Sequence, residues 1–143
     1  MKKSIFFLFV LFVSCISLSF SEEYSINKKP KSCRVQLIGL KCIQTEGSFS
    51  ADRIYMKMVV NGKARNAGSG SLSMNTGDYV DLTGGDSFSL DGRIGVELWD
   101  DDTFDADDFL GRAYISCNSK GAGEKYMSFT EDGAYYKLYY RVY

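Results

Sequence analysis

The densest group of chemically useful side chains is an acidic segment, Asp100–Asp108, which carries six aspartates in nine residues. It follows an alternating apolar stretch that ends at Trp99, and Phe109-Leu110-Gly111 comes directly after it. Like charges at this density repel one another and raise the energy of a folded loop. A hard cation relieves that repulsion, and Ca²⁺ accepts about six to eight oxygen ligands in flexible geometry. The segment therefore predicts calcium as the cofactor.

Two other interpretations of the acidic segment fit it less well. A helix–loop–helix calcium loop requires a glycine at its sixth position and a glutamate at its twelfth. Counted from Asp100, these positions hold Asp105 and Gly111, and counting from Asp101 fails in the same way. A solvated acidic turn is the other alternative, but such a turn has no need of the bulky Phe104 in its middle.

The segment and its flanks resemble the third calcium loop of C2 domains. The shared pattern, which runs here from Val96 to Gly111, is an apolar strand, Asp-x-Asp, five residues, Asp, and then apolar-apolar-Gly. C2 domains also carry two acids five residues apart in an earlier loop, followed by a strand that contains tyrosine. This chain has Glu46 and Asp52 in that pattern, with Glu46 in place of the usual aspartate, and Tyr55 in the strand that follows.

The resemblance implies an eight-stranded antiparallel sandwich that holds calcium between loops at one end. It implies the following metal ligands: Glu46, Asp52, Asp100, Asp102, Asp105 and Asp108. For Glu46, the alternative is a plain surface acid. Asp101 and Asp107 lie between the expected ligands and would add to the local field or remain solvated.

The resemblance also implies a partner, either an anionic membrane surface or a cell-surface protein. Phe104, and Phe49 at the tip of the earlier loop, would contact it. Burying one phenylalanine contributes only about 1.5–3 kcal/mol, so this attachment would be weak and would depend on calcium. The alternatives are that Phe104 folds back onto the end of the sandwich and that Phe49 packs against the domain.

Composition excludes several functions. The 143 residues include no histidine, which removes nucleophile–histidine pairs and imidazole zinc sites. A formal net charge of −1 argues against nucleic acid as a partner, because phosphate neutralisation needs clustered lysine and arginine. Paired carboxylates could serve a glycosidase, but nothing in so short a chain indicates the deep cleft that one requires. We therefore expect no enzyme activity.

The N-terminus reads as a secretory signal. Two lysines precede an unbroken apolar run from Ile5 to Val13, and Ser19-Phe20-Ser21 resembles a cleavage site. Strong apolarity fades after about 13 residues, short of the ~20 that span a membrane, so a membrane anchor is the weaker alternative. We expect a signal peptide over residues 1–21, a polar leader over 22–33, a sandwich domain over 34–143, and an extracellular location.

Three cysteines remain after cleavage of the signal, which removes Cys15. A secreted domain can form disulfides, and three cysteines allow one bridge and one free thiol. The sequence does not choose the pair. We prefer Cys42 with Cys117, and the alternative is that Cys33, Cys42 and Cys117 are three buried thiols.

Short alternating segments between turn residues predict an all-β fold, an antiparallel sandwich of eight strands. Asn61-Gly62 and Asp91-Gly92 are typical of tight hairpin turns. The expected strands are Arg34–Ile43, Ile54–Val60, Tyr79–Leu82, Ser87–Leu90, Arg93–Trp99, Ala113–Cys117, Lys125–Phe129 and Tyr135–Val142.

The last expected strand supports an alternative function, that of a carbohydrate- or protein-binding sandwich with at most structural calcium. Its alternation places Tyr135, Lys137, Tyr139, Arg141 and Tyr143 on one face. An outward row of tyrosines can stack against sugars or a partner chain. Cross-strand aromatic and cation–π pairing is the simpler interpretation, and we favour it.

Overall fold

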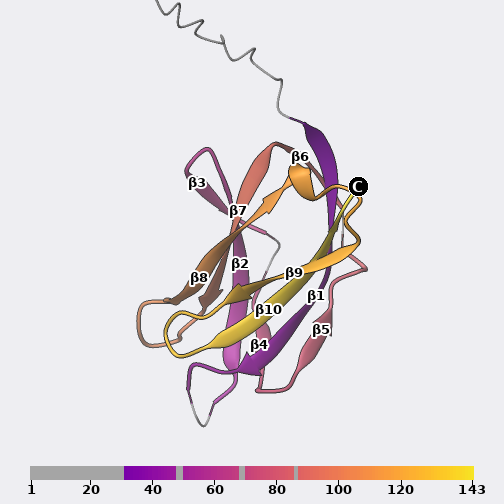
Figure 1. Ribbon diagram of the computed structural model, residues 1–143. Helices are drawn as coiled ribbons and strands as arrows, with labels where there is room; N and C mark the ends of the chain where they lie inside the picture. Colours follow the sequence, from indigo (N-terminus) through magenta and orange to yellow (C-terminus); the bar gives the residue numbers. More distant parts are fainter. Residues whose placement is uncertain (1–30, 48–49, 68–69, 86) are drawn as a thin grey trace, which may run out of the picture.

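Two antiparallel sheets pack face to face in the computed structural model (Figure 1). The structure describes residues 31–47, 50–67, 70–85 and 87–143, so the expected signal peptide, most of the leader and Phe49 lie outside the described residues. The first sheet holds β1 (Ser32–Gln44), β5 (Tyr79–Asp81), β6 (Phe88–Asp91), β9 (Glu124–Phe129) and β10 (Tyr135–Val142). The second holds β2 (Asp52–Val60), β3 (Lys63–Asn66), β4 (Leu72–Met74), β7 (Arg93–Asp100) and β8 (Asp108–Ser116).

In each sheet one long strand pairs along one edge with two short strands: β1 with β5 and β6, and β2 with β3 and β4. The first sheet runs β5-β1-β10-β9, with β6 pairing the opposite half of β1, and the second runs β3-β2-β7-β8, with β4 also pairing β2. A short 3₁₀ turn, η1 (Cys117–Ser119), follows β8. In the part of the chain that the structure describes, no helix has the length and apolarity needed to cross a membrane.

The all-β sandwich is confirmed, but the described residues form ten strands and not eight. β3 and β4 were missed because they are short edge strands, and the four residues of β3 are all exposed. β8 begins at Asp108 and not at Ala113, because a bulge places Leu98 opposite Gly111 and Trp99 opposite Phe109. Gly111 has φ +133° there, and the bulge interrupts the period of two on which the sequence interpretation depends.

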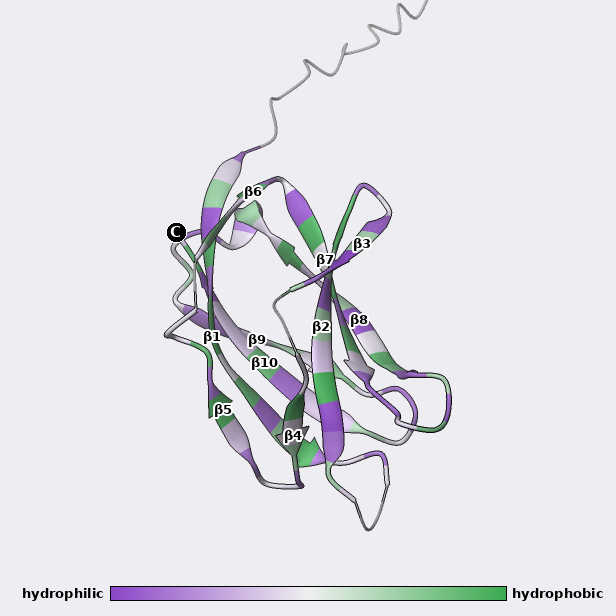
Figure 2. Cartoon of the chain, turned by 180° about the vertical axis from the view of Figure 1, so that it is seen from behind, coloured by the Kyte–Doolittle hydropathy of each residue, from purple (hydrophilic) through white to green (hydrophobic). Residues whose placement is uncertain are grey.

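The core lies between the sheets, and strand alternation supplies it. On β10 the inward residues Tyr136, Leu138, Tyr140 and Val142 are buried, as the sequence predicts. They face the apolar side of β7, where Val96 and Leu98 are fully buried. Figure 2 shows the pattern as hydrophobic and hydrophilic bands that follow one another along the strands.

The expected pairing of Cys42 with Cys117 is wrong, because the disulfide joins Cys33 to Cys117 with 5.4 Å between their Cα atoms. Cys33 lies at the start of β1, opposite Leu90 of β6, and Cys117 follows β8 nearby. Cys42 is nine residues further along β1, which is about 30 Å at ~3.3 Å per residue. It is a buried free thiol at the other end of the sandwich.

Candidate metal centre

Loops that are distant in the sequence are held together at one end of the sandwich. The β1–β2 loop (45–51) is fastened to the β4–β5 turn by a hydrogen bond of 3.1 Å from Thr45 N to Thr76 Oγ1. Gln44 Nε2 donates to the carbonyl of Gly133 at 2.8 Å, which ties the β9–β10 turn (130–134) to the same end. Asp100 and Asp108 pair across β7 and β8 where the acidic loop (101–107) leaves the sheet.

Two buried aspartates form the floor of this end. Asp52 is 2 % exposed and Asp100 is 7 % exposed. Asp52 Oδ2 accepts hydrogen bonds from Glu46 N at 3.1 Å and from the Tyr136 hydroxyl at 2.5 Å, and Asp100 Oδ1 accepts one from Arg53 N at 2.5 Å. Burial raises the pKa of Asp100, and the hydrogen bond from Arg53 opposes that rise. The floor therefore holds concentrated negative charge away from solvent.

Three further carboxylates converge beside the floor. Glu46, Asp108 and Asp132 each place a carboxylate oxygen within 4.8 Å of the others. Glu46 and Asp108 are half-buried, and Glu46 Oε2 is buried without a hydrogen-bond partner among the described residues. Burial, followed by the charges of Asp108 and Asp132, raises the pKa of Glu46 to about 7. Desolvation and the neighbouring Asp102 likewise raise the pKa of Asp108.

This cluster fits a calcium ion in ligand type and in spacing. Two calcium ligands at about 2.3–2.6 Å from the ion can lie no more than about 4.6–5.2 Å apart, and these oxygens, all within 4.8 Å of one another, are close enough to share one ion. All donors are hard carboxylate oxygens, which Ca²⁺ prefers. The unpartnered oxygen of Glu46 is the kind of buried polar atom that a cation would satisfy.

The expected ligands do not all lie equally close to the cluster. Asp102 is half-buried, and its charge contributes to the raised pKa of Glu46, Asp100 and Asp108, so it lies near all three. Asp105 is exposed in the acidic loop. The group formed by Glu46, Asp108 and Asp132 includes none of the other four expected ligands, Asp52, Asp100, Asp102 and Asp105. Phe104 is 96 % exposed and is not folded back onto the sandwich.

Asp132 is the acid that sequence reasoning missed. It lies in the β9–β10 turn, where Asp132 (φ 50°) and Gly133 (φ 75°) both have positive φ. Aspartate and glycine tolerate this conformation, so the Asp-Gly pair favours a tight turn. The turn itself could have been read from the sequence. Its position beside Glu46 depends on the pairing of β10 with β1, which the sequence did not reveal.

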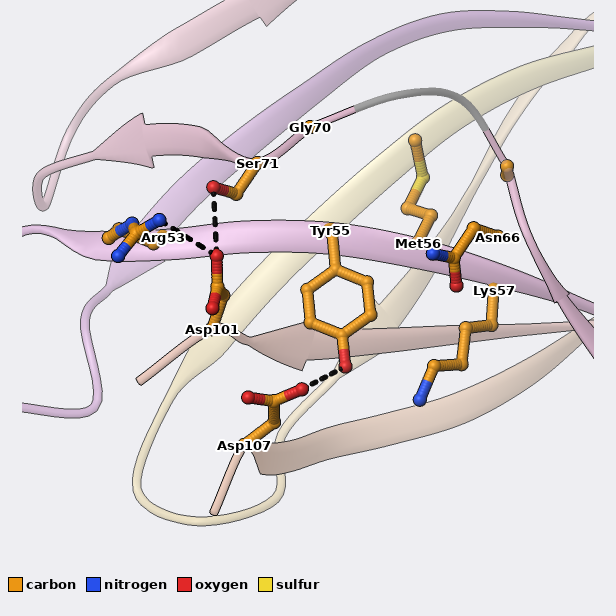
Figure 3. Close-up of a pocket in the computed structure, with 10 residues that line it drawn as sticks. Arg53, Tyr55, Met56, Lys57, Asn66, Gly70, Ser71, Asp101 and Asp107 are labelled. Atoms are coloured by element: carbon orange, nitrogen blue, oxygen red, sulfur yellow. Dashed lines mark hydrogen bonds and ion pairs between the residues drawn. The ribbon is translucent and has the colours of Figure 1, made fainter. Parts of the chain in front are cut away.

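Asp101 and Asp107 anchor the acidic loop to side chains of β2 on the outer face of the second sheet (Figure 3). Asp101 forms an ion pair of 2.9 Å with Arg53 and accepts a hydrogen bond of 3.2 Å from Ser71 Oγ. Asp107 accepts a hydrogen bond of 2.6 Å from the Tyr55 hydroxyl. Burial, together with this bond to Asp107, raises the pKa of Tyr55. These contacts border a shallow groove of about 530 Å³ on that face.

A second surface feature is a row of tyrosines on the outer face of the first sheet. The ring centroid of Tyr139 lies 6.3 Å from that of Tyr79 and 5.9 Å from that of Tyr126. Lys137 Nζ lies 4.6 Å from the centre of the Tyr126 ring. Gly39 leaves room for the row, because a Cβ at that position would collide with Tyr79. The contacts are the cross-strand and cation–π pairs that we favoured from the sequence.

Comparison with known proteins gives matches at the level of structure only. No protein-family model matches the chain, and no curated protein sequence matches it. A structure of two C2 domains, A and B, of extended synaptotagmin 2 superimposes with a TM-score of 0.56 and 15 % identity, over 99 % of this chain and 47 % of that one. This chain has the fold of a C2 domain. It spans about half of the length of that two-domain structure.

Two further solved structures share the C2 fold with this domain. The calcium-bound form of the extended synaptotagmin 2 domains superimposes with a TM-score of 0.52 and 16 % identity, over 80 % of this chain and 46 % of that one. The first C2 domain, domain A, of a plant extended synaptotagmin 1 has a TM-score of 0.52 and 5 % identity, over 80 % of this chain and 95 % of that one. At these identities the likeness concerns the fold, and the function has to be argued from the loops.

Proposed function

We propose that this C2-like domain binds calcium at the loop end and attaches through it to an anionic membrane surface. The observation that carries the proposal is the convergence of Glu46, Asp108 and Asp132 within 4.8 Å around an unpartnered, buried Glu46 oxygen. One of the C2-fold structures similar to this domain is a calcium-bound form, which makes the metal a reasonable ligand for this fold. Secretion, expected from residues 1–21, would place the domain in a calcium-rich medium.

The proposed ligands form two groups, the buried aspartates of the floor and the carboxylates of the cluster beside it. Asp52 and Asp100 would supply buried oxygens below the ion, and Glu46, Asp108 and Asp132 would surround it, with Asp102 nearby. A bound divalent ion neutralises charges that otherwise repel one another, so binding favours a single arrangement of the loops. The groups that anchor Asp101 and Asp107 keep these two acids on the outer face and out of the ligand set.

Asp132 gives the sharpest test of calcium binding, because the family pattern in the sequence does not include it. Isothermal titration calorimetry should show calcium binding with a dissociation constant of about 10⁻⁴–10⁻³ M. Asp132→Asn should weaken binding by about tenfold, or ~1.4 kcal/mol, because one charged ligand is lost.

The matched control is Asp91→Asn. It removes an exposed carboxylate of β6 that pairs with Ser32 at the start of β1, at the far end of the sandwich from the metal centre. Its affinity for calcium should equal that of the unmodified domain. If the unmodified domain releases or absorbs no heat with calcium and shows no other sign of binding, the proposed function is wrong.

Phe104 is the residue expected to reach a membrane, since it is 96 % exposed at the acidic loop. In calcium, the domain should sediment with vesicles that contain phosphatidylserine, and chelator should release it. Phe104→Ala should weaken vesicle binding by about tenfold, which corresponds to part of the ~1.5–3 kcal/mol for burying a phenylalanine. The control is Tyr114→Ala. Tyr114 is another exposed aromatic residue, and it lies on β8 opposite Gly95, outside the acidic loop. If the two variants sediment equally with the vesicles, Phe104 does not contribute to membrane contact.

The tyrosine row supports a second candidate, binding of a carbohydrate or a protein partner to the outer face of the first sheet. Tyr79 and Tyr126 are each about half exposed, at 52 % and 56 %, on either side of Tyr139. This function needs no metal at the acidic loop. Binding that survives chelator would favour it over the calcium-dependent function.

A further inference from the structure

A buried hydrogen bond connects the two sheets next to Glu46, a member of the proposed metal centre. Tyr136 belongs to β10 of the first sheet and is fully buried, and Asp52 begins β2 of the second sheet. The Tyr136 hydroxyl donates to Asp52 Oδ2 at 2.5 Å, although the two residues are 84 positions apart in the sequence. The carboxylate of Asp52 on one sheet therefore has a hydrogen-bond partner, Tyr136, on a strand of the other sheet.

Two donors share one oxygen of Asp52. Besides the tyrosine, Glu46 N donates to the same Oδ2 at 3.1 Å. Two hydrogen bonds to one oxygen fix both the position and the rotation of a carboxylate, and they leave Oδ1 available as a metal ligand. The second of these bonds also ties the backbone of Glu46, a member of the carboxylate cluster, to the orientation of Asp52.

The hydroxyl of Tyr136 donates to Asp52, and the buried thiol of Cys42 lies next to it. Burial, and then the hydrogen bond to Asp52, raise the pKa of Tyr136, so the phenol keeps its proton at any physiological pH. A hydrogen bond to a charged acceptor is also stronger than one between neutral groups. Without this donor, the carboxylate of Asp52, which is 2 % exposed, would have one hydrogen-bond partner fewer.

We propose that Tyr136 is a positioning residue that orients Asp52 for calcium. The inference rests on the proposed function, since it assigns Asp52 Oδ1 to the metal. Groups that hydrogen-bond to metal ligands fix the ligand's orientation, and their loss typically weakens metal binding by about 10- to 100-fold. Tyr136 therefore contributes to calcium affinity through Asp52 and not as a ligand.

The test compares two buried tyrosines of the same strand. Tyr136→Phe removes the hydroxyl and keeps the ring, and it should weaken calcium binding by about 10- to 100-fold in calorimetry. Tyr140→Phe is the matched control, because Tyr140 is also buried, 7 % exposed, and the pKa rise at Tyr140 has burial as its cause and no hydrogen bond. The calcium affinity of Tyr140→Phe should stay within about twofold of that of the unmodified domain, a difference of ~0.4 kcal/mol in binding free energy.

A spectroscopic measurement separates positioning from simple destabilisation. Terbium is a hard cation that prefers the same oxygen ligands, and its luminescence lifetimes in H₂O and D₂O report the number of bound waters. When Asp52 is misplaced, a water should take its position on the metal. Tyr136→Phe should therefore show about one more bound water than the unmodified domain, and Tyr140→Phe should show the same number as the unmodified domain.

The outcomes are distinguishable. If the unmodified domain binds no calcium, the proposed function fails. If it binds calcium and the two variants have the same affinity and the same hydration of terbium, the positioning role of Tyr136 alone is overturned. If Tyr136→Phe is too unstable to titrate, the calcium-induced rise in melting temperature replaces calorimetry, because that rise compares each variant with itself. A rise as large as that of Tyr140→Phe would again overturn the role.

Discussion

Calcium is expected to raise the melting temperature of the domain by about 10 °C at pH 7.5. A ligand that binds only the folded state at about 100 times its dissociation constant stabilises that state by about 2.7 kcal/mol. For a domain of roughly 110 residues, each kcal/mol shifts the melting temperature by about 4 °C. Asp102→Asn removes a half-buried acid beside Asp100 and Asp108 and should reduce the rise to about half, because a tenfold loss of affinity leaves about 1.4 kcal/mol of stabilisation. Differential scanning calorimetry in calcium and in chelator measures the shift.

The pH dependence of the metal-free domain provides a control for the same prediction. The pKa of Glu46 is raised from 4.5 to about 7 in the folded state, so the folded state holds this proton more tightly than the unfolded state does. The resulting stability is present below about pH 4.5 and is lost as the pH rises through about 7. The chelated domain should therefore melt at a lower temperature at pH 7.5 than at pH 5.5, and Glu46→Gln should reduce this difference. Equal melting curves in calcium and chelator at pH 7.5 would contradict the metal centre.

The second large effect should come from the disulfide between Cys33 and Cys117. These cysteines are 84 residues apart, so the bridge closes a long loop in the unfolded chain. Chain-entropy estimates assign such a loop about 4 kcal/mol. The double variant Cys33→Ser, Cys117→Ser should therefore melt about 15 °C lower than the unmodified domain, at about 4 °C per kcal/mol. Calorimetry without reductant provides the comparison.

The free thiol supplies the matched control for the disulfide. Cys42 is fully buried, and Cys42→Ala leaves the bridge intact, so reductant should still lower the melting temperature of this variant by about 15 °C. If Cys42→Ala instead removes the response to reductant, the bridge uses Cys42 and the pairing described above is wrong.

Sequence reasoning performed well wherever the signal is local. The alternation of Tyr136 and Leu138 with Lys137 and Tyr139 depends only on the pleat of one strand, and the buried and outward faces follow it. The acidic segment after Trp99 is also local, and Asp100 and Asp108 lie at its two ends, where they pair across β7 and β8. Its crowded charge is the sequence feature on which the prediction of a cation rests.

Sequence reasoning failed at the contacts between distant strands. Cys42 was chosen over Cys33 because no local pattern says which end of a 13-residue strand meets Cys117. Asp132 was overlooked because its turn comes close to Glu46 only through the pairing of β10 with β1. The short, polar β3 was missed because an exposed edge strand buries no apolar face and so leaves no periodic signal.

The sequence by itself determined the β-sandwich class, the inward and outward faces of its long strands, and the acidic loop that invites a cation. These properties depend on neighbours along one chain segment, where the backbone period and like-charge repulsion act directly. The tertiary structure decided that Cys33 bonds to Cys117, that Asp132 joins Glu46 and Asp108, and that Tyr136 holds Asp52. Each of these depends on which segments the two sheets bring together, because hydrogen bonds and ligand geometry are set over a few ångströms in space, whatever the separation in sequence.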